Sequence, residues 1–184
     1  MKELDLSHLF CEVLGGLIGI LLVVCLLDVF GLLSLSIVWQ EVKNNASLAG
    51  ATVLLIGSYL VGLVVDAFGM VFDMYVTDKW DAAKNRKVGA REEFFKHASE
   101  HAFRYWQEQW IYFSCYRNLF MLVVPGIIVW SWSAYKYRGC GAAIVCFVFS
   151  GIVAGALWLA MRELLGVYYK IQEGYSTPQG NPNP

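Results

Sequence analysis

Charge is the first thing that this 184-residue sequence lacks. Charged residues make up 16% of it and hydrophobic residues 58%, whereas ordinary soluble domains carry about 25% charged residues. A composition this poor in charge argues against a soluble globular domain. The formal net charge of −1 also argues against a general binder of polyanions, so we expect no DNA or RNA polymer among the partners.

The sequence also lacks a disulfide framework and a cleavable leader. The five cysteines are dispersed, and most of them fall inside apolar stretches, where cysteine behaves as a small hydrophobic residue. Residues 1–8 carry one lysine beside Glu3 and Asp5, and no small-residue cleavage site ends the apolar stretch that follows. We therefore expect the first apolar segment to stay in the protein.

Long apolar runs are what the sequence has in place of charge. Each of the four runs exceeds the about 20 residues that a helix needs to cross a hydrocarbon core of about 30 Å. We predict an all-α integral membrane protein, because these runs lack the polar alternation of barrel strands. The predicted parts are transmembrane helices at residues 9–39, 48–76, 110–132 and 140–161, a cytoplasmic helical hairpin at 77–109 and a disordered tail at 174–184.

The distribution of lysine and arginine predicts the orientation of these helices. The N-terminal segment, the long middle segment and the tail region together carry ten Lys and Arg residues, against three in the other two loops. Positively charged loops stay on the cytoplasmic side of a membrane. We therefore predict a protein of the cell membrane with both termini in the cytoplasm.

The middle segment carries a cluster of basic residues with no acidic residue between them. Its members are Lys84, Arg86, Lys87 and Arg91, and Trp80 precedes them. Such a cluster can hold an anionic lipid headgroup or a phosphate group, and a tryptophan can stack on a base. The simpler interpretation is that these charges only orient the chain and solvate a turn. The sequence leaves three roles open: topology alone, an anionic lipid or a nucleotide-type ligand.

An H-x-x-E-H string lies in the same segment, at His97, Glu100 and His101. On one continuous helix the two histidines would share a face and could bind zinc, with Glu100 beside them as a base. The sequence offers no third protein ligand, so surface ion pairs of Glu93 with His97 or of Glu100 with Arg104 explain these residues better. We expect no metal site and no cofactor.

The charged residues Asp28, Asp66, Asp73 and Arg117 lie within the predicted spans. An isolated charge at the centre of a membrane helix costs at least about 2.5–3.5 kcal/mol, so such residues pair, face water or do both. The second and third runs cross in opposite directions, which brings Asp66 and Arg117 to similar depths and predicts an ion pair. Asp28 has no basic residue at its expected depth. It is therefore protonated, bonded to a neighbour such as Ser58, or facing an aqueous path.

Glycines and one proline predict where helices touch and bend. Two G-x-x-x-G pairs let helices approach closely within or between protomers, namely Gly15 with Gly19 and Gly151 with Gly155. Pro125 removes a backbone donor from the third run, and Gly126 follows it directly. This dipeptide predicts a hinge.

The general plan is similar to that of small membrane effectors of bacterial antiviral signalling systems. The likeness lies in the four spans, the very short outer loops and the basic, aromatic segment at residues 79–109. The resemblance implies a homo-oligomeric channel that a cytoplasmic nucleotide controls.

Several classes of function remain open at this point. A homo-oligomeric channel or pore, gated by an anionic ligand or lipid, accounts for Asp28, for Arg117 in a helix with a hinge, and for the glycine pairs together. The alternative is a non-conducting four-span interaction or assembly subunit, and a transporter is a third class. An enzyme is not expected, because the sequence has no Ser/His/Asp set and no phosphate-binding loop. The expected partners are the lipid bilayer, further copies of the chain, and a nucleotide or an anionic lipid.

Overall fold

The computed structural model describes residues 6–44, 47–76, 79 and 90–174. These residues form the helices α1 (Leu6–Val29), α2 (Leu35–Asn44), α3 (Leu48–Tyr75), α5 (Ala90–His97), α6 (Glu100–Arg138) and α7 (Cys140–Gly174). Four of them, α1, α3, α6 and α7, are long and apolar enough to cross a membrane. The prediction of an all-α protein with four helices of membrane-spanning length is confirmed. The predicted tail lies outside the described residues from Tyr175 onward.

The first span is shorter than the sequence analysis predicts, because α1 already ends at Val29. Gly31 adopts a left-handed conformation with φ of 70°. The amides of Gly31 and Leu32 donate to carbonyls in the last turn of α1 at 3.1 and 2.9 Å. These two bonds form a Schellman motif, which satisfies the last carbonyls of a helix and ends it. The chain then restarts as α2, a separate short helix that has no buried residue.

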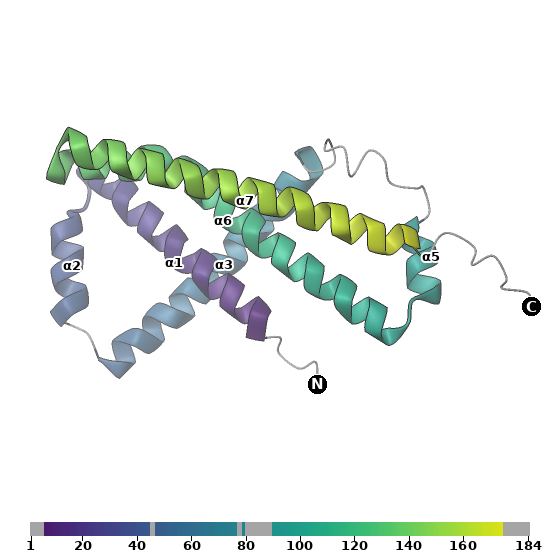
Figure 1. The fold of residues 1–184 in the computed structure, drawn as a ribbon. Coiled ribbons are helices and arrows are strands. Elements are labelled where there is room, and N and C mark those ends of the chain that lie inside the picture. Colours follow the sequence, from purple (N-terminus) through teal and green to yellow (C-terminus); the bar gives the residue numbers. More distant parts are fainter. Residues whose placement is uncertain (1–5, 45–46, 77–78, 80–89, 175–184) are drawn as a thin grey trace, which may run out of the picture.

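The two longest helices, α6 and α7, lie side by side (Figure 1). Gly139, with φ of 82°, is the single residue that joins them. α6 begins at Glu100, within the predicted helical hairpin at residues 77–109, and α7 runs past its predicted limit, since it ends at Gly174 rather than at Met161. The 39 residues of α6 span about 58 Å at about 1.5 Å per residue. About half of this helix therefore extends past a hydrocarbon core of about 30 Å.

Aromatic side chains join α5 to α6 and to the C-terminal part of α7. Phe94 of α5 is completely buried, and its ring centroid lies 5.6 Å from that of Trp106. Trp106 in turn stacks on Tyr168 of α7 at 5.1 Å, and Tyr168 also contacts Trp110 at 5.1 Å. Buried aromatic rings contribute large apolar areas and favourable ring contacts. We refer to Phe94, Trp106, Trp110 and Tyr168 as the aromatic cluster.

Helix α1 lies along α6 and crosses α3 (Figure 1). Gly19 of α1 lies against Leu122 of α6, and Asp28 lies against Lys136. From the first pair to the second, the residue number rises in both helices. α1 and α6 therefore run in the same direction. Their last turns therefore meet at the same end of the molecule.

The crossing of α1 and α3 is a contact of backbone against backbone. A Cβ atom on Gly16 would lie 1.6 Å from the carbonyl oxygen of Ser58, and one on Gly62 would lie 2.0 Å from the carbonyl oxygen of Glu12. No residue other than glycine fits at either position without moving a helix. Small residues at such crossings are typical of membrane helices, because they let the backbones approach closely.

The first half of α3 leaves the other long helices (Figure 1). Residues 48–57 are all exposed or half-buried, and the buried residues of this helix are Ser58, Gly62 and Gly69. The start of α3 therefore presents apolar side chains to its surroundings, whereas the rest of the helix has one face against α1 and α6 and still exposes side chains such as Phe68 and Met74 on another.

Candidate functional site

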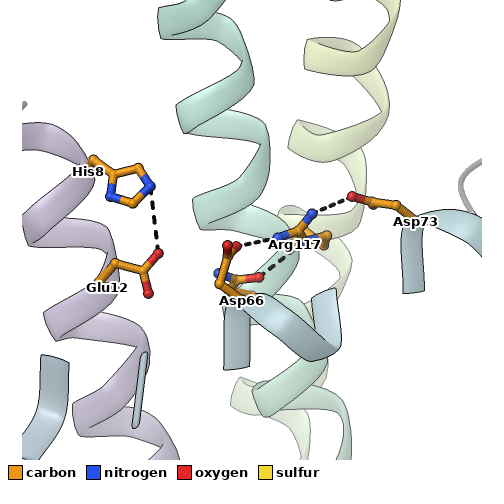
Figure 2. A network of polar contacts seen from close by, with 6 residues as sticks. His8, Glu12, Asp66, Asp73 and Arg117 are labelled. Carbon is orange, nitrogen blue, oxygen red and sulfur yellow. Dashed lines mark hydrogen bonds and ion pairs between the residues drawn. The ribbon is translucent and has the colours of Figure 1, made fainter. Parts of the chain in front are cut away.

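Arg117 is the centre of a polar network inside the long apolar helices (Figure 2). Its side chain is 1% exposed. The guanidinium donates from Nη2 to Asp66 Oδ1 at 2.5 Å, from Nη1 to Asp73 Oδ2, and from Nε to Asn118 Oδ1 at 3.1 Å. Asn118 also donates from Nδ2 to Asp66 Oδ1 at 3.0 Å. The predicted ion pair of Asp66 with Arg117 is confirmed. We refer to Asp66, Asp73, Arg117 and Asn118 as the Arg117 network.

The spacing of residues along α3 shapes the acidic side of this network. Asp66, Gly69 and Asp73 lie three and four residues apart and therefore share one face of the helix. The guanidinium of Arg117 lies over Gly69, where a Cβ atom would come within 2.4 Å of Nε. Glycine thus opens the space between the two carboxylates. A planar guanidinium with five N–H donors can bond both carboxylates at once from that position.

Glu12 of α1 lies beside the Arg117 network, and the sequence analysis missed it. The residue is 3% exposed. Its Oε1 lies 3.8 Å from Nε2 of His8, one turn earlier on α1 (Figure 2), and its Oε2 has no hydrogen-bond partner in the described part of the chain. An acidic residue four positions into the first predicted span was a visible signal, because such residues are rare inside membrane helices.

Among the described residues of this region, carboxyl groups outnumber positively charged groups. Glu12, Asp66 and Asp73 supply three carboxyl groups, whereas Arg117 supplies one permanent positive charge and His8 is charged only when it is protonated. The side chains of Asp66 and Asp73 remain 21% and 17% exposed. A site with excess carboxylate in a low dielectric attracts cations and protons. Both are therefore candidate ligands for this region.

The prediction that Asp28 lacks a basic neighbour is wrong. Lys136 donates to Asp28 Oδ1 at 3.2 Å and to its backbone oxygen at 3.0 Å, while Tyr137 donates to Oδ1 at 2.7 Å. The Leu35 amide adds a further bond to Oδ1 at 3.2 Å. Because α1 ends one residue after Asp28 and α6 continues to Arg138, the two helix ends meet at this level. We refer to Asp28, Leu35, Lys136 and Tyr137 as the Asp28 cluster.

Ser58, the neighbour suggested for Asp28, lies elsewhere. It donates to the carbonyl of Leu54 at 2.7 Å, within its own helix, and its backbone contacts Gly16 at the crossing with α1. Ser58 therefore belongs to the contact between α1 and α3, some distance along α1 from the Asp28 cluster.

The two histidines of the H-x-x-E-H string do not share a helix. His97 is the last residue of α5 and His101 belongs to α6, because Ser99 caps the start of α6 by accepting from the Ala102 amide at 3.2 Å. The alternative interpretation is confirmed. Oε2 of Glu93 lies 3.4 Å from Nε2 of His97, and Oε1 of Glu100 lies 2.7 Å from Nη2 of Arg104.

The predicted G-x-x-x-G pairs are only partly involved in helix contacts. Gly19 lies against Val61 of α3, but Gly16 rather than Gly15 makes the close backbone contact. A Cβ atom on Gly15, Gly151 or Gly155 would meet nothing within 4 Å. Gly151 and Gly155 are exposed, so α7 turns this pair away from the rest of the chain.

The predicted hinge lies inside one continuous helix. α6 extends from Glu100 to Arg138 and includes Pro125. Gly126 is buried, and a Cβ atom there would come within 2.7 Å of the Trp130 ring. Gly126 therefore makes room for the indole one turn further along the helix, a packing role that the sequence analysis did not foresee.

Most of the predicted basic cluster lies outside the described residues. Trp80, Lys84, Arg86 and Lys87 belong to that part of the chain. Arg91 is described and exposed, and its guanidinium carbon lies 5.6 Å from the centre of the Phe95 ring.

Comparisons with family models, with curated proteins and with solved structures found no match for this chain.

Proposed function

We propose that this protein is a homo-oligomeric membrane channel or pore, in which cations pass the carboxylates of the Arg117 network. One observation carries this proposal: two carboxylates, Asp66 and Asp73, stay partly exposed on a helix that is otherwise apolar. Ionisable residues inside membrane helices are rare, and they mark ion or proton pathways.

The position of Asp66 along α3 supports an aqueous path, whereas Asp73, about 38 Å from the start of α3, lies past a hydrocarbon core of about 30 Å. Asp66 lies 18 residues after the start of α3, which corresponds to about 27 Å at about 1.5 Å per residue. This distance is shorter than the about 30 Å of a hydrocarbon core. Lipid contacts would be costly for a carboxylate at this depth. Water in a pore removes that cost, and so does a polar group of a neighbouring protomer.

The course of α3 supports assembly with further copies of the chain. Its N-terminal half diverges from α1, α6 and α7 (Figure 1) and exposes large apolar side chains, among them Val53, Leu55 and Ile56. Lipid can cover these side chains, but it cannot solvate the carboxylates that continue the same helix. A neighbouring protomer placed along α3 would bury the apolar half and enclose the acidic half.

Control by an anionic cytoplasmic ligand is the second part of the proposal. The basic residues Lys84, Arg86, Lys87 and Arg91, with Trp80, would bind a nucleotide-type signal in antiviral defence or an anionic lipid. The aromatic cluster supports this idea, because it packs α5, which begins next to these residues, against α6. Since α6 carries Arg117, a ligand that favours one position of α5 could shift the network.

The proposed setting is the cell membrane with both termini in the cytoplasm. The charge distribution supports this orientation. A reporter fused after Pro184 should then be cytoplasmic, and a cysteine at Lys136 should react with an impermeant reagent added from outside. Labelling from the other side would reverse the orientation.

A non-conducting interaction or assembly subunit is the alternative function. The near-complete burial of Arg117 and its bonds to three side chains favour this alternative. A guanidinium held in this way can act as a static clamp between α3 and α6. Conduction therefore has to be measured.

Reconstitution tests the two functions against each other. The protein is purified in detergent for a mass measurement and then placed in liposomes for measurements of cation and anion flux. We expect an oligomer with cation-selective flux, and we expect the double change Asp66→Asn with Asp73→Asn to remove the selectivity. Glu108→Gln, at an exposed position of α6, is the matched control. A monodisperse monomer without flux would support the interaction subunit instead.

Changing all four basic residues to Gln tests the gating. We expect oligomer size and topology to persist while the response of the flux to added nucleotide or anionic lipid is lost. An unchanged response would limit these residues to orienting the chain.

A further inference from the structure

We propose that Glu12 binds and releases a proton, and that His8 exchanges this proton with water. This proton site adds to the proposed function, since it would make the Arg117 network sensitive to pH. The binding of the proton itself does not depend on conduction.

The burial of Glu12 is the first observation behind this proposal. The side chain is 4% exposed, and the close contact of its backbone with Gly62 holds this part of α1 against α3. Oε2 accepts no hydrogen bond from the described residues. A carboxylate buried with a bare oxygen lacks the hydrogen bonds and counter-charge that make burial of a charge tolerable. Addition of a proton removes the charge.

The groups that face Glu12 are the second observation. Among the described residues, His8 of α1 lies 3.8 Å from Glu12, and Asp66 of α3 and Arg117 and Cys115 of α6 are near enough to act on it electrostatically. Arg117 already bonds two carboxylates, so the negative charge bonded to it exceeds its single positive charge. Asp66 adds repulsion. This arrangement leaves His8 as the facing group that can bring a further positive charge to Glu12.

The position of His8 is the third observation. Its side chain is 49% exposed, and Nε2 lies 3.8 Å from Glu12 Oε1. Histidine exchanges protons near neutral pH. In the proposed step the N–H bond of the imidazolium breaks, and a bridging water takes this proton and gives one of its own to Oε1 of Glu12. The neutral imidazole then takes a new proton from hydronium, which becomes water. One group is thus half-exposed at the start of α1 and the other is buried, as a relay requires.

A proton fits this site better than a metal ion. In the described part of the chain, no group of three or more His, Cys, Asp or Glu side chains is placed to hold a metal ion. A proton needs a single carboxylate oxygen, which Oε1 of Glu12 provides on the side of His8.

Infrared spectroscopy of the whole protein in liposomes tests proton binding directly. Spectra recorded over a range of pH should contain a protonated-carboxyl band that titrates and that is lost in Glu12→Gln. The control Glu108→Gln should keep this band. If Glu12→Gln does not fold, Glu12→Asp retains a carboxyl group and should shift the band instead of removing it. A titrating band that is unchanged in the Glu12 variants would overturn the proposal.

A flux measurement separates this proposal from the proposed function. Proton flux, followed with a pH-sensitive dye inside the liposomes, should be lost in Glu12→Gln and reduced in His8→Gln, while both variants keep the oligomer mass of the wild type. If the wild type passes no ions but the Glu12 band titrates, the channel proposal fails and the proton site stands. If the wild type passes ions with the same pH dependence as Glu12→Gln, the proton site is rejected and the channel stands.

Discussion

The two polar clusters, one between α1 and α6 and the other between α3 and α6, place buried charge in different settings. The Asp28 cluster holds one carboxylate with one ammonium group, and the Lys136 side chain is 43% exposed. The Arg117 network holds two carboxylates with one guanidinium that is 1% exposed, and Glu12 adds a third carboxyl group nearby. The first cluster is balanced in charge and reaches the surface through Lys136 at a helix end, although Asp28 itself is 1% exposed. In the second, the described carboxyl groups outnumber the positive charges and the guanidinium is buried, while Asp66 and Asp73 stay partly exposed.

This difference distinguishes a structural contact between helix ends, the Asp28 cluster, from a candidate functional site, the Arg117 network. Asp28 joins the ends of α1 and α6 to the first residue of α2, and its charge is matched by Lys136. Burial of the Arg117 guanidinium costs more desolvation free energy than the contact of the half-exposed Lys136 ammonium group with Asp28. Well-packed apolar residues often give equal or greater stability than a buried ion pair. Stability alone therefore gives little reason for an Arg with excess carboxylates in an apolar helix. We therefore propose a functional role for the Arg117 network and a structural role for the Asp28 cluster.

The largest expected effect is that of Arg117→Gln. It removes the guanidinium that bonds both Asp66 and Asp73, and breaking a buried pair in this way costs about 3–5 kcal/mol. Unfolding of the purified protein in detergent by stepwise addition of SDS would give the loss in free energy. If Lys136→Gln costs as much, the contrast between the two clusters is wrong.

The next effect is that of Gly62→Ala, which changes no charge. The new Cβ atom would lie 2.0 Å from the carbonyl oxygen of Glu12, so α1 and α3 have to separate. Overpacking of this kind costs about 1–3 kcal/mol. Gly15→Ala is the matched control, because nothing lies within 4 Å of its Cβ position. Equal stability of the two variants in the same SDS titration would show that the crossing does not hold the helices together.

A double change sharpens the view of the Arg117 network as one unit. Asp66→Asn in the background of Arg117→Gln removes a carboxylate that has lost its partner. Residues in contact couple by about 0.5–3 kcal/mol, so the double variant should be more stable than the sum of the single changes predicts. Additive losses would mean that the two side chains do not meet in the membrane.

The smallest effect is expected for Lys136→Gln. An ion pair with a partly exposed partner contributes less than about 1 kcal/mol, and Asp28 keeps its bonds from Tyr137 and from the Leu35 amide. Thermal unfolding in detergent should therefore show a small shift in Tm. A collapse of the fold in this variant would give the Asp28 cluster a larger role than the one assigned to it.

The sequence by itself determined the helical class, the four spans and the pair of Asp66 with Arg117. Apolar runs longer than a hydrocarbon core leave little choice but helices. Two consecutive spans with opposite directions bring residues near the same membrane face together, which is enough to pair the charges. The end of α1 was also readable, since Gly31 is a residue that favours the left-handed conformation after a helix, although the run of apolar residues around it concealed this signal.

Only the tertiary structure decided which residues face each other across the helices. Asp28 meets Lys136 because α1 and α6 run in parallel and end at one level. Glu12 comes beside Arg117 because Gly16 and Gly62 fix where α1 crosses α3. An almost uniformly apolar helix gives no sign of its own rotation, since every face is compatible with lipid. The rotation is set by close contacts between backbones, and those contacts exist only once the helices are packed.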